Sequence, residues 1–185
     1  MASDTTTEPQ LPLTGIRAVE LGDALAAAYA GRLLADLGAD VVKVERPGGD
    51  PLRAVGPFAD GSPDPEASVP FAYYHAGKRS VLADAAMIQA LTERADVLVR
   101  CTATGADWLD DEALARVESV NPGLVTADIT TRGRGAGDRG MSDLLALAAG
   151  GLLSLNGEHG PVRVRGEMAS VHAAAQDPPG ARHRS

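Results

Sequence analysis

The chain has 185 residues, a single cysteine and a formal net charge of −8, and aromatic residues make up 3% of it. This length suits one domain with a core built from Ala, Val and Leu, and the acidic balance argues against nucleic acid or an anionic membrane as the main partner. One cysteine, Cys101, excludes an internal disulfide framework. With neither a signal peptide nor a membrane-spanning apolar run, we expect a cytoplasmic protein.

Residues 1–10 are polar and predict a disordered lead-in, residues 11–175 predict one domain, and residues 176–185 form a separate tail. Within the domain, an apolar strand at 16–21 is followed by Asp23 as a candidate N-cap of a helix. The expected apolar face of that helix is made of Ala26, Ala30, Leu33 and Leu37. Gly38 suits a left-handed C-terminal cap, and the valine-rich segment that follows predicts a buried parallel strand.

Residues 46–79 are rich in Gly and Pro and hold most of the aromatic residues, which predicts a long functional loop. Strands are then expected at 80–83, 96–99 and 124–129. Asp84 and Asp110 should cap the helices between them, and an apolar helix should cover 143–155. This alternation indicates an α/β fold with a Rossmann-like, mainly parallel sheet and flanking helices, whose ligands bind at the carboxyl ends of the strands.

The segment GAGDRG at 135–140 matches the dinucleotide-binding pattern, and Glu158 follows at a suitable distance for a ribose partner. In that fingerprint the first glycine closes a turn directly off a strand, whereas here the polar run 130–134 intervenes. We therefore favour a glycine loop, and rank a dinucleotide-dependent oxidoreductase last among the functions considered.

In order and spacing, the chain resembles the family III CoA-transferases, which include formyl-CoA and carnitine CoA-transferases and the related α-methylacyl-CoA racemases. The resemblance is carried by residues 11–53, 75–81, 93–99, 120–130 and 142–174. It implies a nucleotide-fold domain that binds acyl-CoA and transfers CoA to a carboxylic acid. A carboxylate nucleophile of the enzyme becomes a thioester with CoA. Coenzyme A is then a substrate, and neither a permanently bound cofactor nor a metal is implied.

The resemblance also assigns candidate site residues. Arg46 matches the family arginine that binds the nucleotide end of CoA, and Lys78 and Arg79 are further cations for the phosphates. Leu25 and Ala26 match the helix-start residues that contact CoA. The Gly-Pro pair that usually follows them is absent, so the backbone path there is not guaranteed by sequence.

The nucleophilic aspartate of the family corresponds to Glu167, which follows a glycine at an expected helix start. The dipole at such a position favours an anionic carboxylate. The extra methylene moves the oxygens by about 1 Å, which is enough to impair a reaction that needs near-contact geometry. Glu167 is therefore either the nucleophile or only a favourable helix-start residue. Ser142 replaces the histidine of the racemase branch, which argues against racemisation.

Family members are roughly twice as long and interlock as dimers, whereas here the pattern stops near Ala174 and a Pro-containing tail follows. A truncated gene, a frameshift and one half of a split protein remain alternatives. Two main functions therefore stand: a CoA-transferase that needs a homodimer or a partner chain, and a non-catalytic CoA-binding or assembly fragment. Leucine-rich surface in 144–155 should be uncovered and should promote association.

Overall fold

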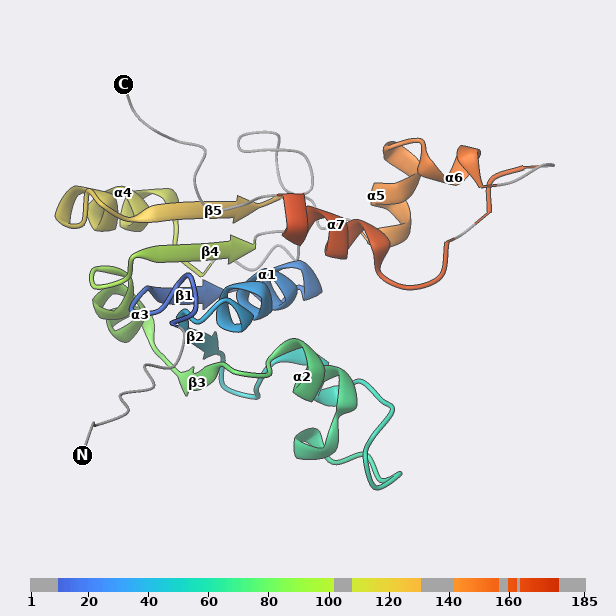
Figure 1. The fold of residues 1–185 in the computed structure, drawn as a ribbon, viewed down its shortest axis with the longest axis horizontal. Helices are drawn as coiled ribbons and strands as arrows, with labels where there is room; N and C mark the ends of the chain where they lie inside the picture. Colours follow the sequence, from blue (N-terminus) through green and yellow to red (C-terminus); the bar gives the residue numbers. More distant parts are fainter. Residues whose placement is uncertain (1–9, 102–107, 131–141, 157–159, 163, 177–185) are drawn as a thin grey trace, which may run out of the picture.

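The computed structural model describes residues 10–101, 108–130, 142–156, 160–162 and 164–176. Five strands form one parallel sheet in the order β3-β2-β1-β4-β5 (Figure 1). The strands are β1 (Arg17–Leu21), β2 (Asp40–Glu45), β3 (Arg79–Leu82), β4 (Val97–Cys101) and β5 (Val125–Ile129). The α/β, Rossmann-like fold expected from the sequence is confirmed.

Helices cover both faces of the sheet. Helix α1 (Leu25–Asp36) packs on one face, and α3 (Ala85–Thr92) and α4 (Asp111–Val120) pack on the other. Each face of the sheet has its own hydrophobic core, and successive residues of a strand point into opposite cores. Ala18 packs in the core under α1, and Val19 packs in the core under α3 and α4. Among the described residues, the buried apolar set contains no Phe, Tyr or Trp, so the core rests on small aliphatic side chains.

Several predicted helix signals are present in the structure. The Asp84 carboxylate accepts a hydrogen bond from the Met87 amide at 2.9 Å, and Asp110 does the same for the Ala113 amide at 2.7 Å. Gly38 follows α1 with φ +99°, a conformation that only glycine adopts without strain. These local devices fix where α1, α3 and α4 begin or end.

The predictions for α1 need two corrections. Its N-cap is Ala24, without a side-chain cap, because the Asp23 carboxylate pairs with Arg46 instead. Of the predicted apolar face only Ala26 is buried, and the other buried positions of the helix are Ala27, Ala28, Gly31 and Leu34. At Gly31 the helix needs its smallest residue, because the buried side chain of Glu20, from β1, occupies the space beside it.

The segment predicted as a loop contains short helices, and the predicted apolar helix is broken. The first region holds η1 (Pro51–Ala54), η2 (Pro65–Ala67) and α2 (Val69–Tyr74). Helix α5 (Asp143–Ala149) stops at two glycines, and Gly151, at φ +76°, starts α6 (Leu152–Leu155) in a new direction. Helix α7 (Met168–Gln176) returns to pack against α1 and α5.

The α5 and α6 segment extends away from the sheet on the side toward which the strands point (Figure 1). Its leucines are partly uncovered, with Leu145 56% and Leu155 80% exposed, whereas Leu147 is buried. The expected exposed apolar surface is therefore present in this chain. In the described portion, no helix is long and apolar enough to cross a membrane.

Candidate CoA site at the carboxyl edge of the sheet

The carboxyl edge contains the point at which the chain changes direction across the sheet. Strands β2 and β3 are added in turn on one side of β1, and the chain then crosses to the other side of β1, where it forms β4 and β5. Ligands of open parallel sheets bind in the crevice outside the strand ends at such a switch point. Here the switch point lies between the ends of β1 and β4, where Leu21 is in register with Arg100.

Three side chains from the ends of adjacent strands meet at this switch point. Arg46 directly follows β2, Asp23 follows β1, and Trp108 lies between β4 and α4. The Arg46 guanidinium carbon is 4.0 Å from the centroid of the Trp108 ring, and its Nε is 3.5 Å from an Asp23 carboxylate oxygen. The side chain of Arg46 remains 43% exposed. The predicted nucleotide-binding arginine therefore lies at the switch point, held by an aromatic ring and a carboxylate.

The start of α1 lies beside this group. Leu25 is half-buried and Ala26 is buried, and their first-turn amides are not capped by the Ala24 side chain. The preceding turn packs tightly against β4, because a Cβ on Gly22 would lie 2.9 Å from the Cβ of Cys101. Real Cβ atoms do not approach that closely, so this turn requires glycine. The Cys101 thiol at the end of β4 is buried.

A buried charge cluster lies beneath the turn between β1 and α1. The Lys43 ammonium is 2.9 Å from Asp50 and 3.5 Å from Glu20, and it donates to the Gly22 carbonyl. The Lys78 ammonium donates to Glu20 at 2.6 Å and to the Ala28 carbonyl at 2.6 Å. His75 completes the cluster, with Nδ1 3.2 Å from the Lys78 ammonium. Two lysines thus tie both ends of the β1–α1 connection to the sheet.

The charges of this cluster balance. Burial holds the pKa of His75 well below its usual range, at about 3, and the neighbouring Lys78 ammonium adds to this effect, so the imidazole is neutral. Burial also lowers the pKa of Lys78. The pKa of Lys43 is raised, because the attraction of Glu20 and Asp50 outweighs its burial. Two carboxylates then face two ammonium groups, which is the condition for burying them.

A second ion pair closes the segment after β2. Arg53 donates to both oxygens of Glu45, at 2.8 and 2.9 Å, and its guanidinium carbon lies 3.8 Å from the Phe71 ring centroid. The Arg53 hydrogen bonds lower the pKa of Glu45 to about 2 against the opposing effect of burial, and the Ser80 hydroxyl adds to the lowering. Arg53 therefore ties the segment after β2 to the end of that strand.

The structure separates the adjacent residues Lys78 and Arg79. The Lys78 side chain is 1% exposed and lies under α1. Arg79 begins β3, is 67% exposed, and pairs with Asp40 at the start of β2. Because Arg46 follows the other end of β2, the structure does not bring Arg79 to the edge that carries Arg46.

Glu167 immediately precedes α7 and is exposed. Its carbonyl accepts the first helical hydrogen bond from the Val171 amide at 3.0 Å. Burial raises the pKa of the Tyr74 hydroxyl, and Tyr73, Tyr29 and the Glu167 charge add to this effect. The Asp143 carboxylate binds the Ser170 amide at 2.8 Å and so ties α7 to α5.

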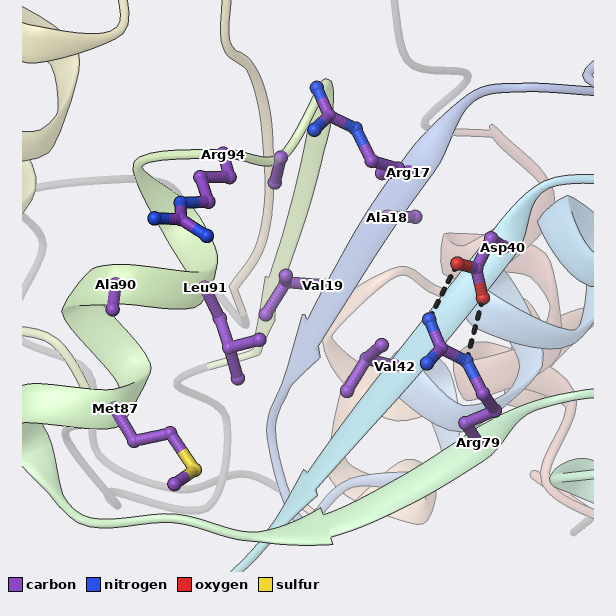
Figure 2. A pocket seen from close by; sticks show the side chains of 11 residues that line it. Arg17, Ala18, Val19, Asp40, Val42, Arg79, Met87, Ala90, Leu91 and Arg94 are labelled. Carbon is purple, nitrogen blue, oxygen red and sulfur yellow. Dashed lines mark hydrogen bonds and ion pairs between the residues drawn. The ribbon is translucent and has the colours of Figure 1, made fainter.

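A cavity of about 280 Å³ lies at the opposite, amino edge of the sheet. Figure 2 shows Val19, Val42 and Leu91 lining it, with Arg79 paired to Asp40 at its side. Arg17 also lines it and pairs with Asp96 at 3.2 Å. Because this cavity lies at the amino ends of the strands, whereas ligands of open parallel sheets bind outside the carboxyl ends, the switch point is the stronger candidate site.

The described part of the chain contains no group of three or more His, Cys, Asp or Glu side chains arranged to hold a metal ion. The glycine-rich segment 135–140 and Glu158, considered above for dinucleotide binding, lie outside the described residues. The candidate site at the carboxyl edge consists of an arginine, an aromatic ring and the backbone amides at the start of α1.

Sequence reasoning missed Trp108 and the buried charge cluster. Charged residues in strands that are otherwise apolar, Glu20 in β1 and Lys43 in β2, were the available signal for the cluster. Such residues must find partners inside the fold. No comparable signal points to Trp108, because its partner Arg46 is distant in sequence.

Comparisons with known proteins identify the family to which the chain is similar. Residues 13–176 match the model of CoA-transferase family III. The chain is 41% identical over 162 residues to a succinate–glutarate CoA-transferase of Agrobacterium fabrum, covering 80% of this chain and 40% of the relative. It is 38% identical to subunit BbsE of the succinyl-CoA:(R)-benzylsuccinate CoA-transferase of Thauera aromatica, with 79% and 39% covered.

A crystal structure of a CaiB/BaiF family protein from Brucella suis superposes with a TM-score of 0.76 at 31% identity, covering 91% of this chain and 47% of that one. The chain thus spans about 40–50% of the length of these relatives. With its five-stranded parallel sheet and nearly its whole length matched, the chain belongs to CoA-transferase family III.

Proposed function

We propose that this chain supplies the CoA-binding part of an acyl-CoA:carboxylate CoA-transferase. The observation that carries the proposal is the position of Arg46 at the switch point of the sheet, beside the uncapped start of α1. Arg46 binds the nucleotide end of CoA, and the amides at Leu25 and Ala26 lie along the pantetheine. The buried Lys78 ammonium donates to the Ala28 carbonyl and so holds the first turns of α1 in position.

The chemistry proposed for the complete site is two-step acyl transfer through a carboxylate. A Glu167 oxygen attacks the thioester carbonyl carbon of acyl-CoA, the carbon–sulfur bond breaks, and CoA leaves as a thiolate from the mixed anhydride. The thiolate then attacks the Glu167 carbonyl carbon and releases the acyl group as a free carboxylate. The resulting glutamyl-CoA thioester passes CoA to the acceptor acid by the same two steps in reverse.

The substrates proposed are a short dicarboxylyl-CoA and a small carboxylic acid. This assignment rests on the relatives, whose names refer to succinate, glutarate and succinyl-CoA. The remaining wall of the site would come from the rest of a longer protein, from a second copy or from a partner chain, because this chain covers less than half of its relatives.

The second candidate function is CoA binding without turnover. It is favoured by Glu167 itself, which is exposed and carries one methylene more than the matched aspartate. The two functions differ in one measurable product. Incubation of the purified chain with succinyl-CoA, followed by hydroxylamine and peptide mass mapping, should detect a Glu167 adduct only if the chain performs the first steps of transfer.

The control for this experiment is Glu167→Gln, which cannot attack a thioester. Adduct on Glu167 in the wild type and none in the variant would support the transferase. CoA binding with no adduct, even when the missing half is supplied from a related full-length protein, would favour the binding fragment. The absence of both would contradict both candidates.

A further inference from the structure

The cavity at the amino edge of the sheet has a mostly apolar lining with charged side chains around it (Figure 2). It measures about 280 Å³, and most of its 11 lining residues are apolar. Val19 and Val42 of the sheet face Leu91 of α3 across it. Ala90 and Ala95 also line it, and their small side chains leave room between the helix and the strands. A short alkyl chain would therefore find apolar contacts here that remove it from water.

Three guanidinium groups line the same cavity, and their charges are only partly compensated. Arg17 pairs with Asp96 at 3.2 Å, and Arg79 pairs with Asp40 at 2.5 Å. Arg94, which follows α3 and is exposed, forms no ion pair within the described part of the chain. Three positive charges thus face two negative ones, and this balance suits a ligand with one negative charge.

We propose that this cavity is a second ligand site, which binds a short- to medium-chain aliphatic carboxylate through Arg94 and the apolar lining. A planar guanidinium presents parallel N–H donors that match the two oxygens of a carboxylate. A phosphate monoester carries about two negative charges at pH 7 and exceeds what the lining balances. The site is separate from the proposed CoA site, because Arg79 and Arg46 lie at opposite ends of β2.

A series of aliphatic acids tests the two parts of this site. Calorimetric titration of butanoate, hexanoate and octanoate into the purified chain measures their affinities. Affinity should rise along the series by up to about 4-fold for each added methylene that the cavity covers. Octylamine has the same chain length as octanoate but the opposite charge, so it should bind more weakly.

Variants of the lining locate the ligand. Arg94→Gln removes the charge of an exposed residue and should weaken octanoate binding by about 3- to 10-fold, a modest loss because the contact is open to water. Arg94→Lys keeps the charge and should restore part of this loss. Ala90→Leu places a larger side chain on the cavity side of α3, and should weaken octanoate more than butanoate. Arg116→Gln is the matched control, because this exposed arginine of α4 does not line the cavity.

The outcomes distinguish this site from other modes of binding. Equal octanoate affinity in the wild type, Arg94→Gln and Ala90→Leu would place the ligand elsewhere, such as on the exposed leucines of α5 and α6, and would overturn the proposal. Octylamine binding as tightly as octanoate would also overturn it, as would the absence of saturable octanoate binding at millimolar concentrations. CoA should leave octanoate affinity unchanged, whereas competition would show a shared site. Failure of the chain to bind CoA would refute the proposed function and leave this inference intact.

Discussion

Gly31 on α1 should be intolerant of even one methyl group. A Cβ at this position would lie 2.0 Å from an Oε atom of Glu20 and 3.0 Å from the Lys78 ammonium. Alanine normally stabilises a helix by about 1 kcal/mol relative to glycine. Here the methyl group would displace a buried carboxylate from its lysine, and breaking a buried ion pair costs about 3–5 kcal/mol.

We therefore expect Gly31→Ala to lower the free energy of unfolding by about 2–4 kcal/mol. Urea unfolding followed by Trp108 fluorescence measures this change. Gly123→Ala is a matched control, because the nearest atom to a Cβ there is 3.8 Å away, and its effect should stay within about 0.5 kcal/mol. A Gly31→Ala variant as stable as the wild type would refute the close approach of α1 to the Glu20 carboxylate.

Three further predictions concern pH, chemistry and association. The pKa of His75 is lowered to about 3, so its imidazole stays neutral in the folded chain between about pH 6.5 and 5. In the unfolded chain the same imidazole takes up a proton below about pH 6.5. The free energy of unfolding should therefore fall from about pH 6.5 to 5, by up to about 1.4 kcal/mol per pH unit. Urea titrations of the wild type and His75→Gln check this, and an equal slope in both would contradict it. Glu167→Asp, with the missing half supplied in trans, should raise turnover of succinyl-CoA, because it shortens the side chain to the family length; unchanged or lower turnover would count against the misplacement of Glu167. Replacing the exposed Leu145 and Leu155 with Glu should reduce the binding of a hydrophobic dye and the self-association measured by light scattering. No change in either measurement would show that the surface around these two leucines does not cause association.

The sheet and its helices could be predicted because their signals are local. Valine-rich segments specify β2 and β4, and Asp84 and Asp110 cap the helices that the sequence assigns to them. The same reasoning failed for Asp23, a typical capping residue, because a tertiary ion pair with Arg46 competes for its carboxylate. A cap is a local preference, and a contact between strand ends can override it.

The site could be predicted in part, since Arg46 and the start of α1 follow from strand ends and from the family pattern. What sequence could not supply is the direction of each side chain. Lys78 and Arg79 are neighbours, yet one ammonium is buried under α1 and the other cation is exposed at the amino edge. Trp108 could not be placed either, because only the order of the strands brings it to Arg46.

Calorimetric titration of CoA into the wild type, Arg46→Ala and Arg79→Ala tests most directly whether CoA binds at the carboxyl edge. The two arginines lie at opposite ends of β2, so the pair of variants distinguishes the two edges of the sheet. We predict that Arg46→Ala weakens CoA binding by about 1–3 kcal/mol, while Arg79→Ala binds as the wild type does. Loss of affinity in Arg79→Ala with full affinity in Arg46→Ala would place CoA at the amino edge and contradict this assignment.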